Sequence, residues 1–544
     1  YNICRIYKMY APSQNMPLNT YQVVSPADNQ TNFLAGQTIR LTIPRSTGFF
    51  DPHTSNLRIQ VAVENMNYKM AFSQSCGVAS LIDMVRVSVG GQIISETTEY
   101  ATLKKLFVDY TESLSISQRR ATQTGQHDYV LQTENVAGTG WKPSQANVGP
   151  LSVTSGAILG QALNGDASVS IGASAKDCKF LMTLDGVGLF EMLQVVPCVA
   201  IGDILVEIRL VQNNTDALKV LPATAIAQNV EAITDGDLTV VLDPNANNGF
   251  LGFTNASNSP YAVGMEIKVL DTDGNVAAGA NPHILTGIAQ DNDTGKITLT
   301  FTGAMDGAEA GADNRIVIVK GTDTNEAVAT NTRFVVKRTD LLLNVVRPPP
   351  QYIDGIMGKV NEGMVLDLNA YTTYRATLQS NIKAQTVEIP CFVSRARAVF
   401  SVSRKQDDAV LTIDNATDRN LNGQYEGLSN YRWQVGTVYY PNQPVQLDQM
   451  LGGLHFSAQH IVELEKAMVS AQLPVRSLLK TKQNFVVGRA LAKHGASVNL
   501  NATGLRWYAE YNLTTQPTIP LDVVSFVNHT TRIIITPQGV QVLM

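Results

Sequence analysis

Residues 80–109 constrain the fold of this 544-residue chain most strongly, because the hydrophobic period changes within this one stretch. Val85 and Val87 alternate with polar residues, which predicts a strand with one buried face. The run Gly90-Gly91-Gln92 then predicts a tight turn into a second extended run, since glycine adopts positive φ without steric cost. From residue 100 onward, apolar residues recur at helical spacing, with Lys104 and Lys105 expected on the outer side. The unit is therefore strand, turn, short strand and helix.

The same order of elements occurs a second time near the C-terminus. Residues 431–446 contain a strand pattern and a turn marked by prolines, and within residues 447–469 Ile461, Leu464 and Met468 recur at helical spacing. The flanking strands also match, because 395–404 alternates like 57–64, and 505–513 alternates like 204–210. We therefore predict an all-β chain built from two tandem eight-stranded sandwiches with short helices.

Composition divides the chain further. Residues 1–35 contain three prolines and no sustained period, which predicts an extended N-terminal arm. We expect the first sandwich over 36–218, with a long loop at 111–176 that is rich in small and polar residues. Residues 219–333 are predicted to form an inserted small β-domain, because from Glu231 to Glu326 there are 14 acidic residues against four basic ones.

A proline run marks the boundary between the halves. We predict the last strand of the first sandwich and a stiff linker over 334–350, since Pro348, Pro349 and Pro350 lack the backbone N–H that a ladder or helix interior needs. The second sandwich then occupies 351–544. No apolar window reaches the ~18 residues of a membrane span, and no signal-peptide pattern occurs at the start, which lacks Met and is not expected to be the true N-terminus.

The low charge points to an assembly subunit. Only 16% of residues are charged, against about 25% in a typical globular protein, so we expect neighbouring subunits to cover much of the surface. The net charge of −5 argues against a general electrostatic grip on nucleic acid, and no direct sequence-specific nucleic-acid binding is expected. The five cysteines have no CxxC spacing and are expected to be reduced thiols.

No motif predicts catalysis or a cofactor. The seven histidines offer no HExxH pair, and the Gly-rich nucleotide loops and the GxSxG elbow are missing from the sequence. Asp271 and Asp273 resemble a fragment of a calcium loop without its later glutamate, so a hairpin turn is favoured over a weak surface cation site. We therefore predict no catalytic residues and no firm metal site.

Several passages resemble a known family. LIDMVRVSVGGQIISE (81–96), LFEMLQVVPCVAIGDILVEIRL (189–210) and IPCFVSRARAVFSVSR (389–404) resemble passages of the double jelly-roll major capsid proteins of the tectivirus–adenovirus lineage, with the virophage and polinton-like branch most similar. The residues taken as structural signature are Val85, Val87, Gly90, Gly91, Gln92, Pro197, Pro348, Pro349 and Pro350. The resemblance excludes the acidic insertion.

The resemblance implies a structural role in a virion. Three copies would form a homotrimer with six jelly rolls in a pseudo-hexagonal ring, and such trimers would tile the icosahedral shell of a double-stranded DNA virus, assembled inside the infected cell. Neighbouring capsomers and minor capsid or penton proteins would be the partners. The N-terminal arm would run to neighbours, and the inserted domain would form an outward tower that could meet a host surface.

Two other classes of protein remain open from the residues alone. A tandem β-sandwich surface or carbohydrate-binding protein fits the predicted fold, although the unpaired cysteines weigh against a secreted protein. A β-sandwich glycosidase would need two carboxylates in a cleft, and no such pair stands out in the sequence.

Overall fold

The protein is described from a computed structural model. The structure describes residues 20–27, 30, 32–64, 70–72, 76–112, 123–125, 133–136, 140–143, 178–192, 195–220, 228–242, 266–270, 283–291, 296–305, 315–318, 333–406, 421–423, 425, 427–447, 458–475, 484–493, 496–501, 503–511 and 517–543. Within them no helix is both long and apolar enough to cross a membrane. Asp271 and Asp273 lie outside these residues, as do 1–19 and most of the predicted loop 111–176.

The N-terminal half contains two antiparallel sheets that share one core. The first has the order β1-β19-β3-β10, with β9 also paired to β3, and the second has the order β2-β11-β5-β6. Their bounds are β1 Thr20–Val24, β2 Thr38–Ile43, β3 Phe49–Glu64, β5 Ile82–Val89, β6 Gln92–Thr98, β9 Cys178–Met182, β10 Val196–Pro197, β11 Ile204–Leu210 and β19 Arg333–Val346. We call this unit the first sandwich.

The C-terminal half repeats this arrangement. One sheet has the order β20-β27-β22-β25, with β28 also paired to β27, and the other has the order β21-β26-β23-β24. Their bounds are β20 Met364–Leu378, β21 Ala384–Ile389, β22 Ala396–Lys405, β23 Leu428–Val435, β24 Val438–Gln446, β25 Val486–Ala490, β26 Leu505–Tyr511, β27 Leu521–Thr536 and β28 Gly539–Leu543. We call this unit the second sandwich.

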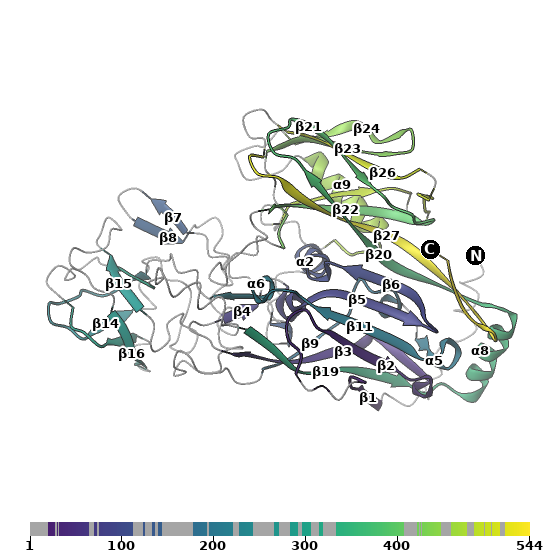
Figure 1. Ribbon diagram of the computed structural model, residues 1–544, viewed down its shortest axis with the longest axis horizontal. Helices are drawn as coiled ribbons and strands as arrows, with labels where there is room; N and C mark the ends of the chain where they lie inside the picture. The colour runs from purple at the N-terminus through teal and green to yellow at the C-terminus, as the bar shows by residue number, and fades with distance from the viewer. Residues whose placement is uncertain are drawn as a thin grey trace.

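The two sandwiches have the same topology strand for strand. In chain order β1, β2, β3, β5, β6, β9, β11 and β19 occupy the sheet positions of β20, β21, β22, β23, β24, β25, β26 and β27. The helix α2 (Tyr100–Thr111) follows β6, and α9 (Ala458–Ser470) follows β24 at the matching point. Figure 1 shows the first sandwich below the second, with α2 between them. The predicted repeat of strand, turn, strand and helix is confirmed.

The sequence pattern explains the sandwich cores. Alternate residues of β11 and β26 are buried, as expected for strands with one face toward a core, whereas β5 is buried at all positions except Asp83 and Arg86. In the second sandwich, Trp433 and Trp507 stack with ring centroids 5.9 Å apart, and both are fully buried. Aromatic pairs of this kind fill the space between two packed sheets.

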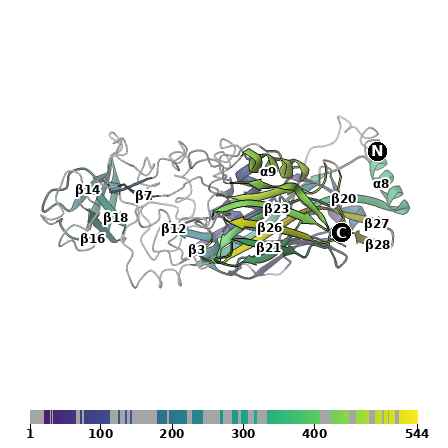
Figure 2. The same ribbon diagram turned by 90° about the horizontal axis from the view of Figure 1, so that it is seen from above.

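The inserted segment forms a separate sheet. Its order is β13-β18-β15-β16-β17-β14, with bounds β13 Gln228–Asn229, β14 Thr239–Leu242, β15 Glu266–Leu270, β16 His283–Gln290, β17 Ile297–Phe301 and β18 Arg315–Ile318. Two further antiparallel pairs, β4 (Met70–Phe72) with β12 (Leu218–Val220) and β7 (Thr133–Val136) with β8 (Gly140–Pro143), complete the sheets. Figures 1 and 2 show the inserted sheet well beyond one end of the sandwiches.

Three local predictions were wrong. Thr20–Val24, predicted as part of the arm, is strand β1, which pairs with Leu341–Val345 of β19, and Phe33 is buried. Pro441 and Pro444 do not mark a turn but lie in β24, an edge strand where a missing N–H leaves no ladder bond unmade. Pro350 is not only linker but begins the helix α8 (Pro350–Glu362), where proline fits the first turn.

The remaining elements are short. They comprise η1 (Arg45–Thr47), η2 (Gly77–Leu81), η3 (Gly188–Glu191), α5 (Cys198–Ile201) and α6 (Asn214–Ala217). The thiols of Cys76, Cys198 and Cys391 are buried.

Candidate functional site

Helix α2 is the centre of the junction between the two sandwiches. Leu103, Leu106, Phe107 and Tyr110 share one buried cluster with residues of β20, β22 and β27 from the other sandwich. The ring of Phe107 meets that of Tyr371 on β20 edge to face, with centroids 5.3 Å apart. The apolar stripe predicted for this helix therefore faces the second sandwich, and it fixes how the halves pack.

The predicted outer position of two lysines was wrong. Lys104 and Lys105 are both buried, and Lys104 Nζ lies 3.4 Å from the carbonyl of Thr183, which follows β9 in the first sandwich. Each charge has a partner, since Lys104 pairs with Asp185 and Lys105 pairs with Asp109, four residues on. Buried ammonium groups require such partners.

Glu99 connects the two sandwiches electrostatically. It lies between β6 and α2 with φ of 54° and ψ of 39°, a left-handed conformation that is uncommon outside glycine. Its carboxylate pairs with Arg375 of β20 and, at 3.2 Å, with Nη1 of Arg404 of β22. The Nη2 of Arg404 also lies 2.8 Å from Asp522 on β27. Abrupt passage from strand to helix thus places a carboxylate of the first sandwich among charges of the second.

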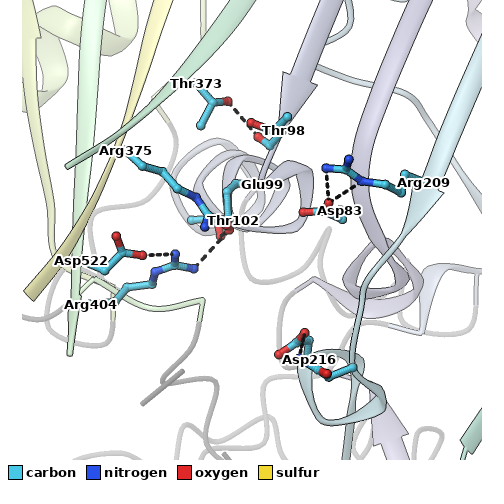
Figure 3. Close-up of polar contacts among 11 residues, drawn as sticks. Asp83, Thr98, Glu99, Thr102, Arg209, Asp216, Thr373, Arg375, Arg404 and Asp522 are labelled. Carbon is cyan, nitrogen blue, oxygen red and sulfur yellow. Dashed lines mark hydrogen bonds and ion pairs between the residues drawn. The ribbon is translucent and has the colours of Figure 1, made fainter. Parts of the chain in front are cut away.

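A cavity of about 570 Å³ opens beside Glu99. Figure 3 shows Arg375, Arg404 and Asp522 on one wall, and Asp83 and Arg209 on the other, where Arg209 Nε donates to Asp83 Oδ2 at 2.8 Å. The lining carries both signs of charge in equal number, namely Arg209, Arg375, Arg404 and Lys405 against Asp83, Glu99, Asp216 and Asp522. Since these charges compensate one another, we interpret them as ion pairs that hold the two sandwiches together and not as a binding site for an ion.

Hydrogen bonds extend the junction along both ends of α2. Thr97 Oγ1 donates to the carbonyl of Tyr371 at 3.2 Å, and Thr373 Oγ1 donates to the carbonyl of Thr98 at 2.8 Å. At the far end, Tyr110 Oη donates to the carbonyl of Asn484 at 2.6 Å. Side-chain hydroxyl groups of one sandwich therefore bind backbone carbonyl groups of the other, which fixes the backbone on both sides of the junction.

Glu191 is a buried carboxyl at the same junction. Its Oε2 accepts a hydrogen bond from Asn369 Nδ2 of β20 at 2.8 Å, and Asn528 Nδ2 donates to Asn369 Oδ1 at 2.7 Å. Burial, with the nearby carboxylate of Asp185, raises the pKa of Glu191 to about 7. The junction therefore contains a group whose charge changes near neutral pH.

The two sandwiches differ in which of their edges are covered. In the first sandwich the β6 edge, with α2, packs on β20, the edge strand of the second. The equivalent edge of the second sandwich is β24 with α9, where Val438, Val462 and Val469 are exposed. The equivalent of β20 is β1.

Tyr21 and Tyr371 belong to these two edge strands. Tyr21 pairs with Asn344 of β19, and Tyr371 pairs with Asn528 of β27. Tyr371 is 0% exposed under α2, whereas Tyr21 is 69% exposed. Among the residues that the structure describes, one edge of each type is therefore left unoccupied.

The signature residues lie in strands, in turns and at the start of a helix, and they do not form one site. Val85 and Val87 are buried on β5, Gly90 and Gly91 have φ of 56° and 82° in the turn, and Gln92 begins β6. Pro197 pairs with Phe49 at the end of β10, and the three prolines at 348–350 lead into α8. The meeting of these charges was missed by sequence reasoning, since Glu99, Arg375 and Arg404 lie far apart in the sequence and no motif links them.

No grouping of three or more side chains suited to a metal ion occurs in the part of the chain that the structure describes. His460 and His529 are almost fully buried, and burial lowers the pKa of each to about 4, helped for His529 by the charge of Arg397. His460 Nδ1 lies 3.0 Å from Tyr431 Oη. These histidines are neutral parts of the core.

Two tandem sandwiches of this topology, packed side by side with a helix after the fifth strand of each, define a double jelly-roll protein. Similarity to solved structures agrees with this fold. The chain is similar over 97% of its length to 92% of the Faustovirus major capsid protein, with a TM-score of 0.51 and 12% identity.

A chain of the Sputnik virophage structure is similar over 98% of this chain and 90% of its own length, with a TM-score of 0.49 and 10% identity. No protein-family model and no curated protein matches the sequence. The predicted fold class, two tandem eight-stranded jelly rolls with an inserted β-domain, is confirmed.

Proposed function

We propose that this chain is a major capsid protein whose homotrimers tile the icosahedral shell of a double-stranded DNA virus. The proposal is supported by the double jelly-roll fold shared with the Faustovirus major capsid protein and by the low content of charged residues, 16%. Its role is structural and not catalytic, and its place is the virion. The virophage branch stays a prediction.

The observation that carries the proposal is the pair of open edges. The β6/α2 edge is covered by β20 within one chain, while no other described strand or helix covers the β24/α9 edge or the β1 edge. If the second contact repeats the first, the β24/α9 edge of one copy packs on β1 of the next. Such head-to-tail contacts use two different surfaces, and they close into a ring when the rotation allows it. Three chains supply the six sandwiches of a pseudo-hexagonal ring.

The exposed apolar residues fit this contact. Tyr21 and Val23 are 69% and 48% exposed on β1, and Val462 and Val469 are 43% and 46% exposed on α9. Covering four such side chains removes apolar area from water, and an aromatic anchor at the centre of a contact contributes most of the binding energy. In the homotrimer Tyr21 takes the place at α9 that Tyr371 takes at α2.

The remaining partners follow from the same proposal. The inserted sheet lies well beyond one end of both sandwiches (Figures 1 and 2), which supports an outward tower that meets solvent or a host surface. Neighbouring trimers and minor capsid or penton proteins would contact the outer faces. The domain limits predicted from composition remain part of this proposal.

Complementation between two variants tests the ring. Tyr21→Asp damages only the β1 edge, and Val462→Asp damages only the α9 edge. Alone, each variant is expected to be a monomer by light scattering after size exclusion, whereas the wild-type chain is a trimer. A mixture of the two retains one intact contact and is expected to form a dimer that cannot close.

The control is Ile284→Asp, at a 43% exposed position of the inserted sheet. It should leave the trimer unchanged. A wild-type monomer, or a mixture that stays monomeric beside a wild-type trimer, would contradict the head-to-tail contact.

A further inference from the structure

The repeated topology allows Arg432 to be compared with its counterpart in the first sandwich. Strands β5 and β6 are joined by the two-residue turn Gly90-Gly91, and β23 and β24 are joined by residues 436 and 437. Counting back from these turns, Arg86 and Arg432 occupy the same position. Both side chains point away from the core, because the neighbouring residues on either side are buried.

Arg86 is neutralised within its own chain. Its Nε donates to Glu96 Oε2 at 2.8 Å, and its Nη1 lies 3.4 Å from Glu207 Oε2. Glu207 is the residue paired directly with Arg86 across the ladder. Two carboxylates on adjacent strands thus satisfy one guanidinium.

Arg432 lacks both carboxylates. The residue paired with it across the ladder is Tyr508, in the place of Glu207. Its guanidinium carbon lies 4.1 Å from the ring centroid of Tyr439 and 5.4 Å from that of Tyr508. Among the residues that the structure describes, Arg432 has no ion pair, whereas Arg40, Arg86 and Arg209 on the equivalent face of the first sandwich each have one.

The rings beside Arg432 are held in place. Tyr508 Oη donates to Gln434 Oε1 at 2.5 Å, and Gln434 Nε2 donates to the carbonyl of Gly436 at 2.8 Å. Tyr439 and Tyr508 also meet edge to face, with centroids 5.7 Å apart. A guanidinium stacked on a ring keeps its N–H groups in plane, where they can still bind a carboxylate in a bidentate manner. The stack therefore pre-orients a donor.

The other charges of this face are already paired. Arg506 pairs with Glu388, and Lys383 pairs with Glu510. The face thus carries one unpaired cation among tyrosines, and arginine and tyrosine are enriched in the centres of protein interfaces. In Figure 2 the β21-β26-β23-β24 sheet lies toward the viewer, and no other described element covers it.

We propose that Arg432, Tyr439 and Tyr508 form a docking surface for another copy of this chain, which supplies the carboxylate that Arg432 lacks. This inference rests on the proposed capsid function. The occupant is the copy that covers the β24/α9 edge, because Tyr439 belongs to β24 and the surface continues that edge. In the first sandwich, carboxylates of the same chain neutralise Arg86, whereas in the second sandwich a carboxylate of another chain neutralises Arg432.

Zero-length crosslinking tests this assignment directly. A carbodiimide joins a lysine amine to a carboxylate only when the two are in contact. In the R432K variant, assembled from mixed ¹⁴N and ¹⁵N chains, mass spectrometry should find position 432 joined to a carboxylate of the other isotope label. In the matched R86K variant the link should stay within one chain, to Glu96 or Glu207.

Charge reversal gives the second readout. R432A is expected to weaken association between chains about two- to fivefold, as one exposed ion pair would, and R432E about tenfold, through like-charge repulsion. R86A should leave the association constant unchanged. Thermal unfolding of each isolated variant confirms that the fold is intact.

The outcomes separate the two proposals. A wild-type chain that stays monomeric overturns the capsid function and this inference with it. A wild-type trimer with no 432 link between chains, and with unchanged association in R432E, overturns the docking surface alone. A link from 432 to a different protein in particles purified from cells would also overturn it.

Discussion

Removal of the Glu99 carboxylate should loosen the junction without unfolding either sandwich. Glu99→Gln keeps the side-chain shape but cancels the ion pairs with Arg375 and Arg404. The side chains of Glu99 and Arg404 are 11% and 12% exposed, so solvent screens this pair little. A hydrogen bond between charged groups contributes about 1.5–3 kcal/mol, which is the coupling expected in a Glu99/Arg404 double-mutant cycle.

Amide exchange along α2 measures this coupling locally. A loss of about 1.5–3 kcal/mol speeds exchange through local opening by about tenfold to a hundredfold. Exchange in β26, on the far side of the second sandwich, should stay unchanged. Arg506 and Glu388 serve as the control pair, because their side chains are 51% and 71% exposed and should show little coupling.

A coupling of zero between Glu99 and Arg404 would refute the reasoning. The same holds if α2 exchange in Glu99→Gln equals that of the wild-type chain. Either result would mean that the apolar contact of α2 with β20 fixes the junction alone.

Three further predictions concern pH and packing. Burial raises the pKa of Glu191 from its ordinary value of 4.5 to about 7, so its contribution to stability is full below about pH 4.5 and is lost as pH rises to about 7. Glu191→Gln should remove that part of the pH dependence, as followed by thermal unfolding in a pH series. Gly488→Ala would place a Cβ 2.7 Å from Leu464 Cδ1 and 3.2 Å from Ala467 Cβ of α9, so it should destabilise by about 1–3 kcal/mol in thermal unfolding. Gly358→Ala on α8 meets nothing within 4 Å and should stabilise by up to about 1 kcal/mol.

The sandwiches could be predicted from the sequence because their strands carry local patterns. Val85 and Val87 reveal one buried face, and the change to helical spacing after Tyr100 reveals α2 without knowledge of its neighbours. The order of elements also repeats, so each half supports the interpretation of the other. Where the spacing of apolar residues determines the secondary structure, the sequence is sufficient to predict it.

Other features could not be predicted because their cause lies far away in the chain. Lys104 and Lys105 are polar on a helix, and the partners that accompany the burial of Lys104, Thr183 and Asp185, lie about 80 residues later in the chain. Thr20–Val24 is too short to be recognised as a strand, and its partner β19 begins more than 300 residues later. Pro441 and Pro444 signal a turn locally, but they fit a strand whose outer edge is unpaired.

The candidate site was the least predictable part. Glu99, Arg404 and Asp522 come from three distant strands or turns and meet only when both sandwiches have folded. The one local signal is the abrupt change from strand to helix at Glu99, which has a positive φ. Arg432 becomes visible only by comparison with Arg86, since no motif distinguishes it.

The most direct test of the head-to-tail ring is a reconstruction of the purified oligomer by cryo-electron microscopy. We predict a threefold ring of 58.9-kDa chains in which Tyr21 of one copy is buried against the β24/α9 edge of the next. A twofold dimer, or a ring in which Tyr21 remains exposed to solvent, would contradict the account.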